Sequence, residues 1–295
     1  MEVRIMAERT DIAIIGSGPA GMSAAITAAA RGRSIMLFGS TAVSEKLSKA
    51  HQINNYPGFY GQSGEEIAAA FNAHLEAMGI RVTEGKVGSI YSMGDYFSMA
   101  VDTDVYEATT VILASGVSFG RPLPGEDELL GRGVSYCATC DGMLYRGRKA
   151  AVLAYAQEEE READFLASIG VNVDYIPLYK EEPALQNEMN IIRGAQPGSI
   201  EGEGKVEKLI LRDGTGLEED AVFILRSSIA PDKIIGGLEL DGNHVKVDRG
   251  MRTNIPGFFA AGDITGTPYQ YVKSAGEGNV AALSAAGYID ALSRK

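Results

Sequence analysis

The fold is decided by residues 11–21, which read Asp11-Ile12-Ala13-Ile14-Ile15-Gly16-Ser17-Gly18-Pro19-Ala20-Gly21. The run from Asp11 to Ile15 is short, apolar and branched, which is the pattern of a buried parallel strand. After the glycines, the alanine-rich stretch from Met22 to Ala30 favours a helix, and residues 34–38 supply a second strand. The sequence therefore predicts a β-α-β unit of about 30 residues, the length of a mononucleotide-binding half.

The glycines of this turn match G-x-G-x-x-G in the context that the motif requires, after a strand and before a helix. Glycine lets the backbone turn tightly and approach a pyrophosphate, and the helix N-terminus places partial positive charge against it. The acidic residue expected about 20 residues later for the ribose of NAD is missing, because Phe38-Gly39-Ser40 stands there. This counts against plain NAD binding and is compatible with a flavin dinucleotide.

A similar opening recurs later in the chain. Residues 149–153 favour a strand, residues 158–169 a helix and residues 171–176 the next strand. Residues 257–263 form another strand that runs into a Gly-Asp turn. The chain is long enough for about two domains of roughly 150 residues, and both are predicted to be nucleotide-domain-like.

Composition limits the partners and the compartment. The net charge of −12 argues against nucleic acid, because phosphates would be repelled at long range. No apolar run approaches the roughly 18 residues of a membrane helix, and residues 1–6 are too polar and short for a signal peptide. Two cysteines in one motif, without a disulfide framework, fit a reducing cytoplasm. We therefore expect a cytoplasmic protein with no nucleic-acid or membrane partner.

The two cysteines, Cys137 and Cys140, are separated by Ala138 and Thr139 and followed by Asp141. A disulfide that closes so short a loop stabilises little, so the pair is expected to be oxidised and reduced repeatedly. A structural zinc site would need four ligands, and the three histidines of the chain are scattered without paired spacing. The sequence thus favours a redox dithiol over a metal site.

Five motifs together resemble those of the low-molecular-weight thioredoxin reductases, in the same order and spacing over nearly the whole chain. They are Gly16-Ser17-Gly18-Pro19-Ala20-Gly21, Asn55-Tyr56-Pro57-Gly58, Val111-Ile112-Leu113-Ala114-Ser115-Gly116, Cys137-Ala138-Thr139-Cys140-Asp141 and Ala261-Gly262-Asp263.

The resemblance implies an α/β protein with two Rossmann-like (three-layer ββα) domains, the second inserted in the first. Residues 1–118 and 246–295 would form a discontinuous FAD-binding domain, and residues 119–245 an inserted domain that carries the dithiol. The inserted domain would rotate about hinges near residues 117–120 and 245–248. The resemblance also implies a homodimer.

Site residues follow from the same resemblance. Cys140 would lie nearer the flavin, Cys137 would exchange with thioredoxin, and Asp141 would be the acid or base that moves the proton. Gln270 matches a glutamine whose segment passes the flavin, although its neighbour, usually arginine, is Tyr269 here. The residues expected to hold FAD are Gly16, Ser17, Gly18, Pro19, Ala20, Gly21, Phe38, Gly39, Lys46, Asn55, Val87, Ala114, Gly116, Gly262, Asp263, Gln270 and Tyr271.

The motifs that bind NADPH in this family are absent. Where the family has a second glycine-rich turn, this chain has Ala154-Tyr155-Ala156-Gln157-Glu158, whose side chains stand where a pyrophosphate must touch backbone. Where the family has arginines for the 2′-phosphate, residues 177–182 offer one lysine beside two glutamates. A single lysine is a poor substitute for a bidentate arginine clamp. We therefore expect no NADPH.

This pattern is similar to the ferredoxin-dependent flavin thioredoxin reductases, which lack the nicotinamide motifs. In those enzymes FAD takes single electrons from reduced ferredoxin and passes a pair to the disulfide. The predicted function is therefore reduction of thioredoxin by ferredoxin through FAD and the dithiol. The sequence leaves three alternatives: an NADPH-dependent reductase with an atypical nucleotide site, an FAD-dependent dithiol oxidase and a non-catalytic redox sensor.

Overall fold

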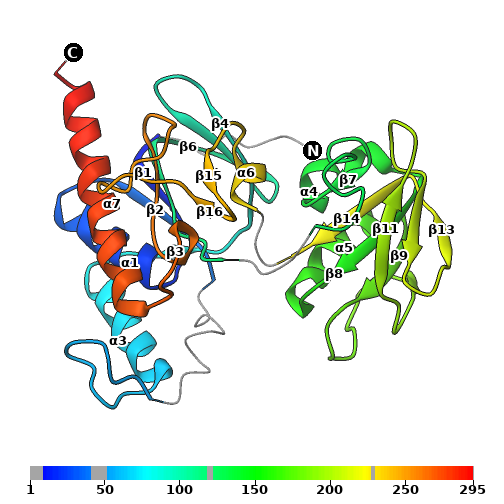
Figure 1. The fold of residues 1–295 in the computed structure, drawn as a ribbon, viewed down its shortest axis with the longest axis horizontal. Coiled ribbons are helices and arrows are strands. Elements are labelled where there is room, and N and C mark those ends of the chain that lie inside the picture. The colour runs from blue at the N-terminus through cyan, green and yellow to red at the C-terminus, as the bar shows by residue number, and fades with distance from the viewer. Residues whose placement is uncertain (1–8, 41–51, 118–121, 227–229, 295) are drawn as a thin grey trace. The chain divides into compact units, whose positions relative to one another are not determined.

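The chain forms two compact units, shown in Figure 1. The structure is a computed structural model and describes residues 9–40, 52–117, 122–226 and 230–294. Unit 1 combines the chain up to Val117 with the chain from Ala230 onward, and unit 2 holds the residues between them. Each unit is described by itself below.

The chain returns to unit 1 earlier than the sequence analysis expects. The predicted return near residues 245–248 is wrong, because unit 1 resumes at Ala230. Helix α6 (Pro231–Ile234) packs against strand β4, and the hairpin of β15 (Leu240–Asp241) and β16 (His244–Val245) contacts the turn η3 (Asp263–Thr265). The hydrophobic side chains of this segment are buried in unit 1, including Ile234 and Val245. The second predicted hinge is therefore internal to unit 1, and most of the first lies outside the described residues.

A seven-stranded sheet forms the centre of unit 1, with the order β3-β2-β1-β6-β5-β4 and β17 added beside β6. Strands β1, β2, β3, β6 and β17 are parallel, whereas β4 and β5 extend the sheet in antiparallel pairs. The strands are β1 (Thr10–Ile15), β2 (Ile35–Phe38), β3 (Val82–Thr83), β4 (Val87–Ser92), β5 (Phe97–Val101), β6 (Asp104–Leu113) and β17 (Phe258–Ala260).

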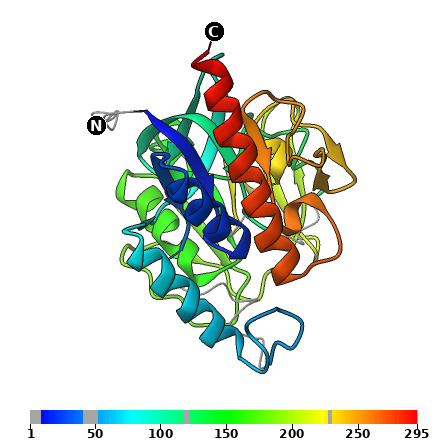
Figure 2. The ribbon, with the colours of Figure 1, turned by 90° about the vertical axis from the view of Figure 1, so that its left-hand side faces the viewer.

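Two helices from distant parts of the sequence pack side by side on one face of this sheet (Figure 2). They are α1 (Pro19–Ala30) and α7 (Tyr271–Leu292), and α3 (Gly64–Ala77) packs beside α1. The facing residues are small, and a Cβ on Gly278 would lie 1.9 Å from the carbonyl oxygen of Ala20. Glycine at position 278 therefore sets how closely α7 approaches the first turn of α1.

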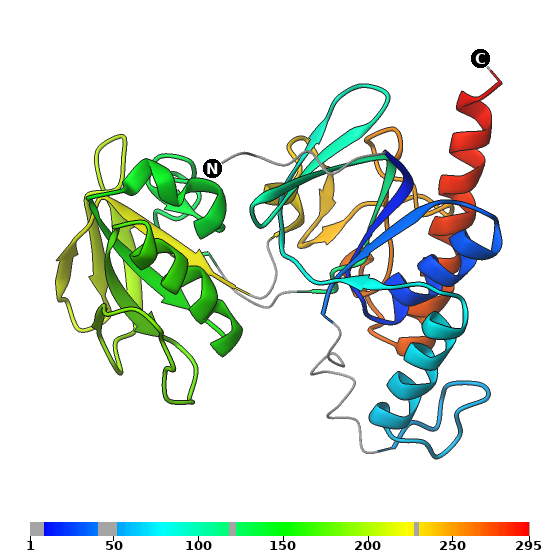
Figure 3. The ribbon, with the colours of Figure 1, turned by 180° about the vertical axis from the view of Figure 1, so that it is seen from behind.

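Unit 2 has three layers, visible in Figure 3. Its parallel sheet has the order β10-β9-β8-β14-β7. One face packs against α4 and α5, and the other against an antiparallel sheet of β11, β12 and β13, so alternate residues of β8 enter two different cores. The elements are β7 (Val134–Ser135), α4 (Ala138–Asp141), η1 (Gly142–Tyr145), β8 (Lys149–Ala154), η2 (Gln157–Glu159), α5 (Glu160–Ser168), β9 (Asn172–Pro177), β10 (Asn190–Ile191), β11 (Pro197–Glu201), β12 (Lys208–Leu211), β13 (Gly216–Glu218) and β14 (Ala221–Leu225).

Within the parts of the chain that the structure describes, no helix combines the length and the hydrophobicity needed to cross a membrane. The longest, α7, has 22 residues and includes glycines, a lysine and acidic side chains.

Candidate active site

Four parallel strands of unit 1 end at the same edge of the sheet. Their last residues are in register: Ile15 pairs with Phe38 and with Leu113, and Leu113 pairs with Ala260. The carboxyl edge of such a sheet is where ligands of doubly wound folds bind. Residues predicted to hold a cofactor follow these ends directly, namely Gly16, Ser17, Gly39, Ala114, Gly116, Gly262 and Asp263.

The first glycine turn is tightly built around its own backbone. A Cβ on Gly16, which has φ +113°, would lie 2.3 Å from the Ala114 carbonyl oxygen, and a Cβ on Gly21 would lie 1.7 Å from the Gly16 carbonyl oxygen. At Gly18 a Cβ would meet no described atom within 4 Å. Gly16 and Gly21 therefore allow the turn to close, whereas Gly18 leaves open backbone in front of α1. This is the arrangement that a pyrophosphate needs.

Residue Ser17 fastens the turn to the end of β2. Its hydroxyl donates to the Ser40 carbonyl oxygen at 2.7 Å. A Cβ on Gly39 would lie 2.4 Å from the Ser17 Oγ, so Gly39 admits this contact. Pro19 and Ala20 begin α1. Phe38 is buried with its ring against Tyr106, so its side chain belongs to the core and only its backbone reaches the edge.

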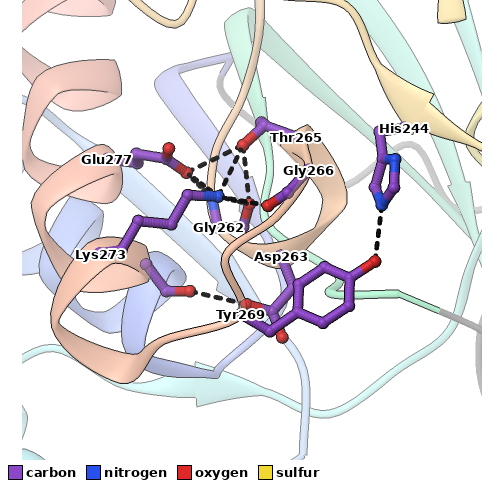
Figure 4. A network of polar contacts seen from close by, with 9 residues as sticks. His244, Gly262, Asp263, Thr265, Gly266, Tyr269, Lys273 and Glu277 are labelled. Atoms are coloured by element: carbon purple, nitrogen blue, oxygen red, sulfur yellow. Dashed lines mark hydrogen bonds and ion pairs between the residues drawn. The ribbon is translucent and has the colours of Figure 1, made fainter. Parts of the chain in front are cut away.

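The loop that carries Asp263 is held by a network from α7 (Figure 4). Lys273 donates from Nζ to the carbonyl oxygens of Gly262 at 3.1 Å and Gly266 at 2.7 Å. Glu277 accepts from the Gly262 backbone N–H and the Thr265 hydroxyl, both at 2.9 Å. The Asp263 carboxylate accepts from the Ser274 hydroxyl at 3.1 Å. These bonds fix the loop, and with it Asp263, on the start of α7.

The sequence analysis missed Lys273 and Glu277. Their four-residue spacing predicts a helical ion pair, and Nζ lies 3.2 Å from the Glu277 Oε2. The spacing does not reveal that both side chains also form hydrogen bonds with the loop that precedes their own helix. Beside it, the Tyr269 hydroxyl lies 2.7 Å from the His244 Nε2, again in Figure 4.

Other predicted cofactor residues lie at different places in unit 1. Asn55 donates from Nδ2 to the Gln270 Oε1 at 2.6 Å, which joins two predicted positions that are 215 residues apart. Tyr271 begins α7, and burial, followed by the charge of Asp263, raises the pKa of its phenol. Val87 is buried at the start of β4. Lys46 lies outside the described residues.

The dithiol motif forms the short helix α4 after strand β7. Cys137 is buried and disulfide-bonded, and its Sγ lies 3.4 Å from the Thr139 Oγ1. The Asp141 Oδ2 lies 2.7 Å from the hydroxyl of the buried Ser135. Cys140 lies in α4, and its side chain is not among the described parts. No group of three or more metal-ligating side chains occurs in the described ranges.

Protein side chains fill the carboxyl edge of the sheet in unit 2. The ends of β8 and β14, Ala154 and Leu225, are paired in register, and the residues that follow are Tyr155 and Arg226. The guanidinium of Arg226 lies 5.0 Å from the centre of the Tyr155 ring. It also forms a bidentate ion pair with Glu126, at 2.7 and 3.0 Å. The side chains of Tyr155, Arg226 and Glu126 therefore occupy the position where the sequence analysis aligns the family's second glycine turn.

The ion pair in this cluster of side chains is largely shielded from water. The Glu126 side chain is 1% exposed and that of Arg226 is 13% exposed. Burial alone would lower the pKa of Arg226, but its hydrogen bonds and ion pair with Glu126 outweigh that effect and raise the pKa. The Tyr136 hydroxyl donates to Glu126 at 2.9 Å, and burial together with this carboxylate raises the pKa of Tyr136 far above its usual range. The sequence analysis did not predict a role for Arg226.

The first turn of α5 is closed by a second network. The Tyr179 hydroxyl donates to the Glu160 carboxylate and lies 2.9 Å from the Tyr175 hydroxyl. Glu160 also accepts from the Ala184 backbone N–H at 3.1 Å. Burial raises the pKa of Tyr175 to about 12. The segment after β9 thus folds onto the helix terminus where a nucleotide phosphate would need free N–H groups.

Known proteins with a similar sequence identify the family of this chain. The sequence profile of the pyridine nucleotide-disulphide oxidoreductase family matches residues 10–154 and 179–278, well over half of the chain. The chain belongs to this family. A thioredoxin reductase of Treponema pallidum (strain Nichols) is 30% identical, and the alignment covers 96% of this chain and 98% of the relative. The predicted membership of the thioredoxin reductases is confirmed.

Solved structures of the same family share the fold. A ferredoxin-flavin thioredoxin reductase from Clostridium acetobutylicum is 49% identical with a TM-score of 0.90, over 98% of this chain and 100% of that chain. A thioredoxin reductase from Gloeobacter violaceus is 29% identical with a TM-score of 0.80, over 96% and 95%. The predicted fold class is confirmed, and this family member is an oxidoreductase acting on a disulfide.

Proposed function

We propose that this protein reduces the disulfide of thioredoxin with electrons from reduced ferredoxin, through FAD and the Cys137/Cys140 dithiol. The observation that carries the choice of donor is the edge of the sheet in unit 2, where Tyr155, Arg226 and Glu126 pack together in place of a glycine turn. A relative that is 49% identical over its whole length is a ferredoxin-flavin thioredoxin reductase.

The residues of unit 1 fit FAD. Gly18 leaves open backbone at the start of α1, which suits a pyrophosphate. The Asp263 loop is preorganised by Lys273 and Glu277, so its backbone and carboxylate are held ready for polar groups of the cofactor. When bound, FAD supplies the ability to accept electrons singly and to deliver them in pairs. We further expect Gln270 and Asn55, which bond each other, to lie at the same site.

The residues of unit 2 fit NADPH poorly. A pyrophosphate needs glycine backbone and helix N–H groups, but Tyr155 carries a large side chain and Glu160 already accepts bonds from Ala184 and Tyr179. Adding a nucleotide there would break the buried Arg226–Glu126 pair or leave it beside phosphates of the same charge as Glu126. Ferredoxin needs no such pocket, because it delivers electrons by docking.

The dithiol region supplies the protons. Reducing the disulfide takes two electrons and, at neutral pH, up to two protons. We assign to Asp141 the delivery of one proton to a departing thiolate and its removal in the reverse direction. Asp141 is next to the motif and is held by Ser135 at 2.7 Å. Immediately beyond it, Met143 and Leu144 are 53% and 69% exposed, which offers an apolar surface for a protein disulfide substrate.

The deciding experiment compares electron donors with the FAD-loaded protein under anaerobic conditions. Reduced ferredoxin should bleach the flavin absorbance and support thioredoxin reduction, whereas NADPH and NADH should do neither at rates typical of an enzyme. Turnover with NADPH would overturn the donor assignment. Oxygen consumption with a dithiol, and no reduction of thioredoxin, would favour the dithiol oxidase. We also expect a homodimer, as the family resemblance implies. Light scattering of the protein as it leaves a size-exclusion column tests this expectation.

A further inference from the structure

The hydroxyl of Ser135 makes three contacts with residues of the dithiol motif. Ser135 ends strand β7 and is 4% exposed. Its Oγ accepts from the Cys137 backbone N–H at 3.1 Å. The same atom lies 2.7 Å from the Asp141 Oδ2 and 3.2 Å from the Cys137 carbonyl oxygen. One buried oxygen therefore contacts the backbone of the first cysteine and the proposed acid.

A serine hydroxyl has one proton to donate and two lone pairs with which to accept. When Asp141 is ionised, Ser135 can donate to its Oδ2 while it accepts from the Cys137 N–H. When Asp141 is protonated, Asp141 can donate to the Ser135 Oγ, and the serine proton can turn to the Cys137 carbonyl oxygen. Both arrangements satisfy the buried hydroxyl, and both keep the Asp141 oxygen at hydrogen-bond distance.

We propose that Ser135 is a positioning residue that holds Asp141 in one place in both of its protonation states. The inference rests on the proposed role of Asp141 in the dithiol chemistry. When the disulfide is reduced, two electrons from the reduced flavin break the S–S bond and leave two thiolates, and Asp141 gives its proton to one of them and recovers a proton from solvent. When a disulfide forms, the same carboxylate takes the proton back. Without the serine, Asp141 loses a donor to its anionic form and its fixed position.

The test measures the pH dependence of the reduced dithiol in the FAD-loaded protein. The protein is reduced with dithiothreitol, desalted anaerobically, and mixed with excess DTNB between pH 5.5 and 9. In S135A we expect the rate at pH 7 to fall about tenfold, and the rate at pH 9, where a larger share of the thiol is already ionised, to stay nearly unchanged. S135T, which keeps a hydroxyl, should restore the rate at pH 7.

Two further variants separate the outcomes. S168A is the matched control, because the Ser168 hydroxyl bonds only the Phe165 carbonyl oxygen in unit 2, at 2.7 Å, and its profile should equal that of the unchanged protein. D141N should show the same selective loss of rate at pH 7, at least as large as that of S135A. If D141N shows this loss and S135A does not, the inference about Ser135 is wrong. If D141N leaves the rate at pH 7 unchanged, the role of Asp141 fails, and the inference fails with it.

Ferredoxin-driven turnover of thioredoxin is measured in parallel with the same variants. A protein with the expected DTNB profiles but no ferredoxin-driven turnover of thioredoxin would support Ser135 as a positioning residue and overturn the proposed function. Flavin content and far-UV spectra establish that S135A is folded. A profile for S135A that is lowered equally at every pH would indicate a structural role and contradict the inference.

Discussion

Single side chains hold the candidate sites in shape, and Lys273 is the clearest case in unit 1. Its ammonium group donates to two carbonyl oxygens of the loop around Asp263. Hydrogen bonds from charged donors contribute about 1.5–3 kcal/mol each, so loosening this loop should weaken whatever it holds. The arrangement therefore links one partly buried cation to cofactor affinity.

We predict that Lys273→Met raises the dissociation constant of FAD by about tenfold or more. Flavin fluorescence at equilibrium measures the change. Lys246→Met is the control, because Lys246 pairs with Glu239 on the surface of the same unit at 3.0 Å. Equal FAD affinity in Lys273→Met and the unchanged protein would contradict the assignment of this loop to the cofactor.

In unit 2, the buried Glu219 couples stability to pH. Burial, followed by its interaction with Asp174, raises the pKa of Glu219 to about 8, and Lys149 Nζ lies 2.8 Å from Asp174 and 3.4 Å from Glu219. Because the folded state holds this proton more tightly than the unfolded chain, Glu219 stabilises unit 2 below its unfolded pKa. That contribution is lost as pH rises through about 8. Burial would raise the pKa of Asp174, but its hydrogen bonds with Lys149 and Asn190 outweigh that effect and lower the pKa, so Asp174 affects stability only in acid.

We predict that the melting temperature of unit 2 falls by several degrees between about pH 5 and 9, and that Glu219→Gln reduces this fall. Thermal unfolding across the pH range measures it. The neighbouring Glu218 is 75% exposed in its pair with Lys208, so Glu218→Gln should leave the slope unchanged. A slope that is the same in Glu219→Gln and in the unchanged protein would show that other groups set it.

At the scale of elements, helix α5 supports the helix of the dithiol. The Ala138 backbone N–H donates to the Glu162 carboxylate of α5 at 2.6 Å. Because Ala138 directly follows Cys137, this carboxylate contacts the backbone next to the first cysteine. A negative charge there disfavours a thiolate. Glu162→Gln keeps an acceptor for this bond and removes the charge.

We therefore predict that Glu162→Gln makes the reduced dithiol react several-fold faster with iodoacetamide at pH 7, since more of the thiol is ionised. Mass spectrometry of the alkylated protein measures the rate. Glu158→Gln, in an exposed position just before α5, is the control for the general loss of one negative charge. A rate for Glu162→Gln no higher than that of Glu158→Gln would contradict the prediction.

A buried ion pair joins two distant segments of unit 2. Glu126 lies in a loop, and its partner Arg226 directly follows strand β14. Removing one partner of a buried pair typically costs about 3–5 kcal/mol, because the other charge stays buried. Arg226→Met should therefore lower the free energy of unfolding of unit 2 by an amount in that range. Chemical denaturation measures the loss.

The double variant Arg226→Met/Glu126→Gln should recover part of that stability, since it buries no unpaired charge. Arg193 and Glu182 form an exposed pair in the same unit, and Arg193→Met should cost far less. A loss in Arg226→Met no larger than in Arg193→Met would contradict the expectation that Glu126 is left as an unpaired buried charge.

For the whole molecule, the sequence alone predicts the fold class, and it proposes most residues of one candidate site. The β-α-β pattern and glycine spacing predict β1, α1 and β2, and the aligned motifs lead to strand ends that share one sheet edge. The return crossing could not be found in this way, because residues 230–245 carry no change of composition and their place depends on contacts with β4 and η3. Sequence patterns also do not predict the roles of Lys273, Ser135 and Arg226, because these roles depend on partners that only the folded chain brings close.

The two units should respond separately to ligand. FAD is proposed to bind unit 1, and a ligand that binds one folded unit stabilises that unit. We predict two thermal transitions by calorimetry, of which FAD raises one by several degrees and leaves the other in place. A single transition that shifts as a whole would contradict independent units.

The pairing of α1 with α7 has a consequence for biosynthesis. The first turn of α1 receives Gly278 of α7 at a distance that no larger residue permits, and these helices bracket unit 2 in the sequence. During translation, the segment that forms unit 2 leaves the ribosome while α1 still lacks its neighbour. Unit 2 can therefore complete its core first, and the proposed flavin site must wait for residues 271–292. A nascent chain arrested before α7 should already protect unit 2 from protease and should not retain FAD.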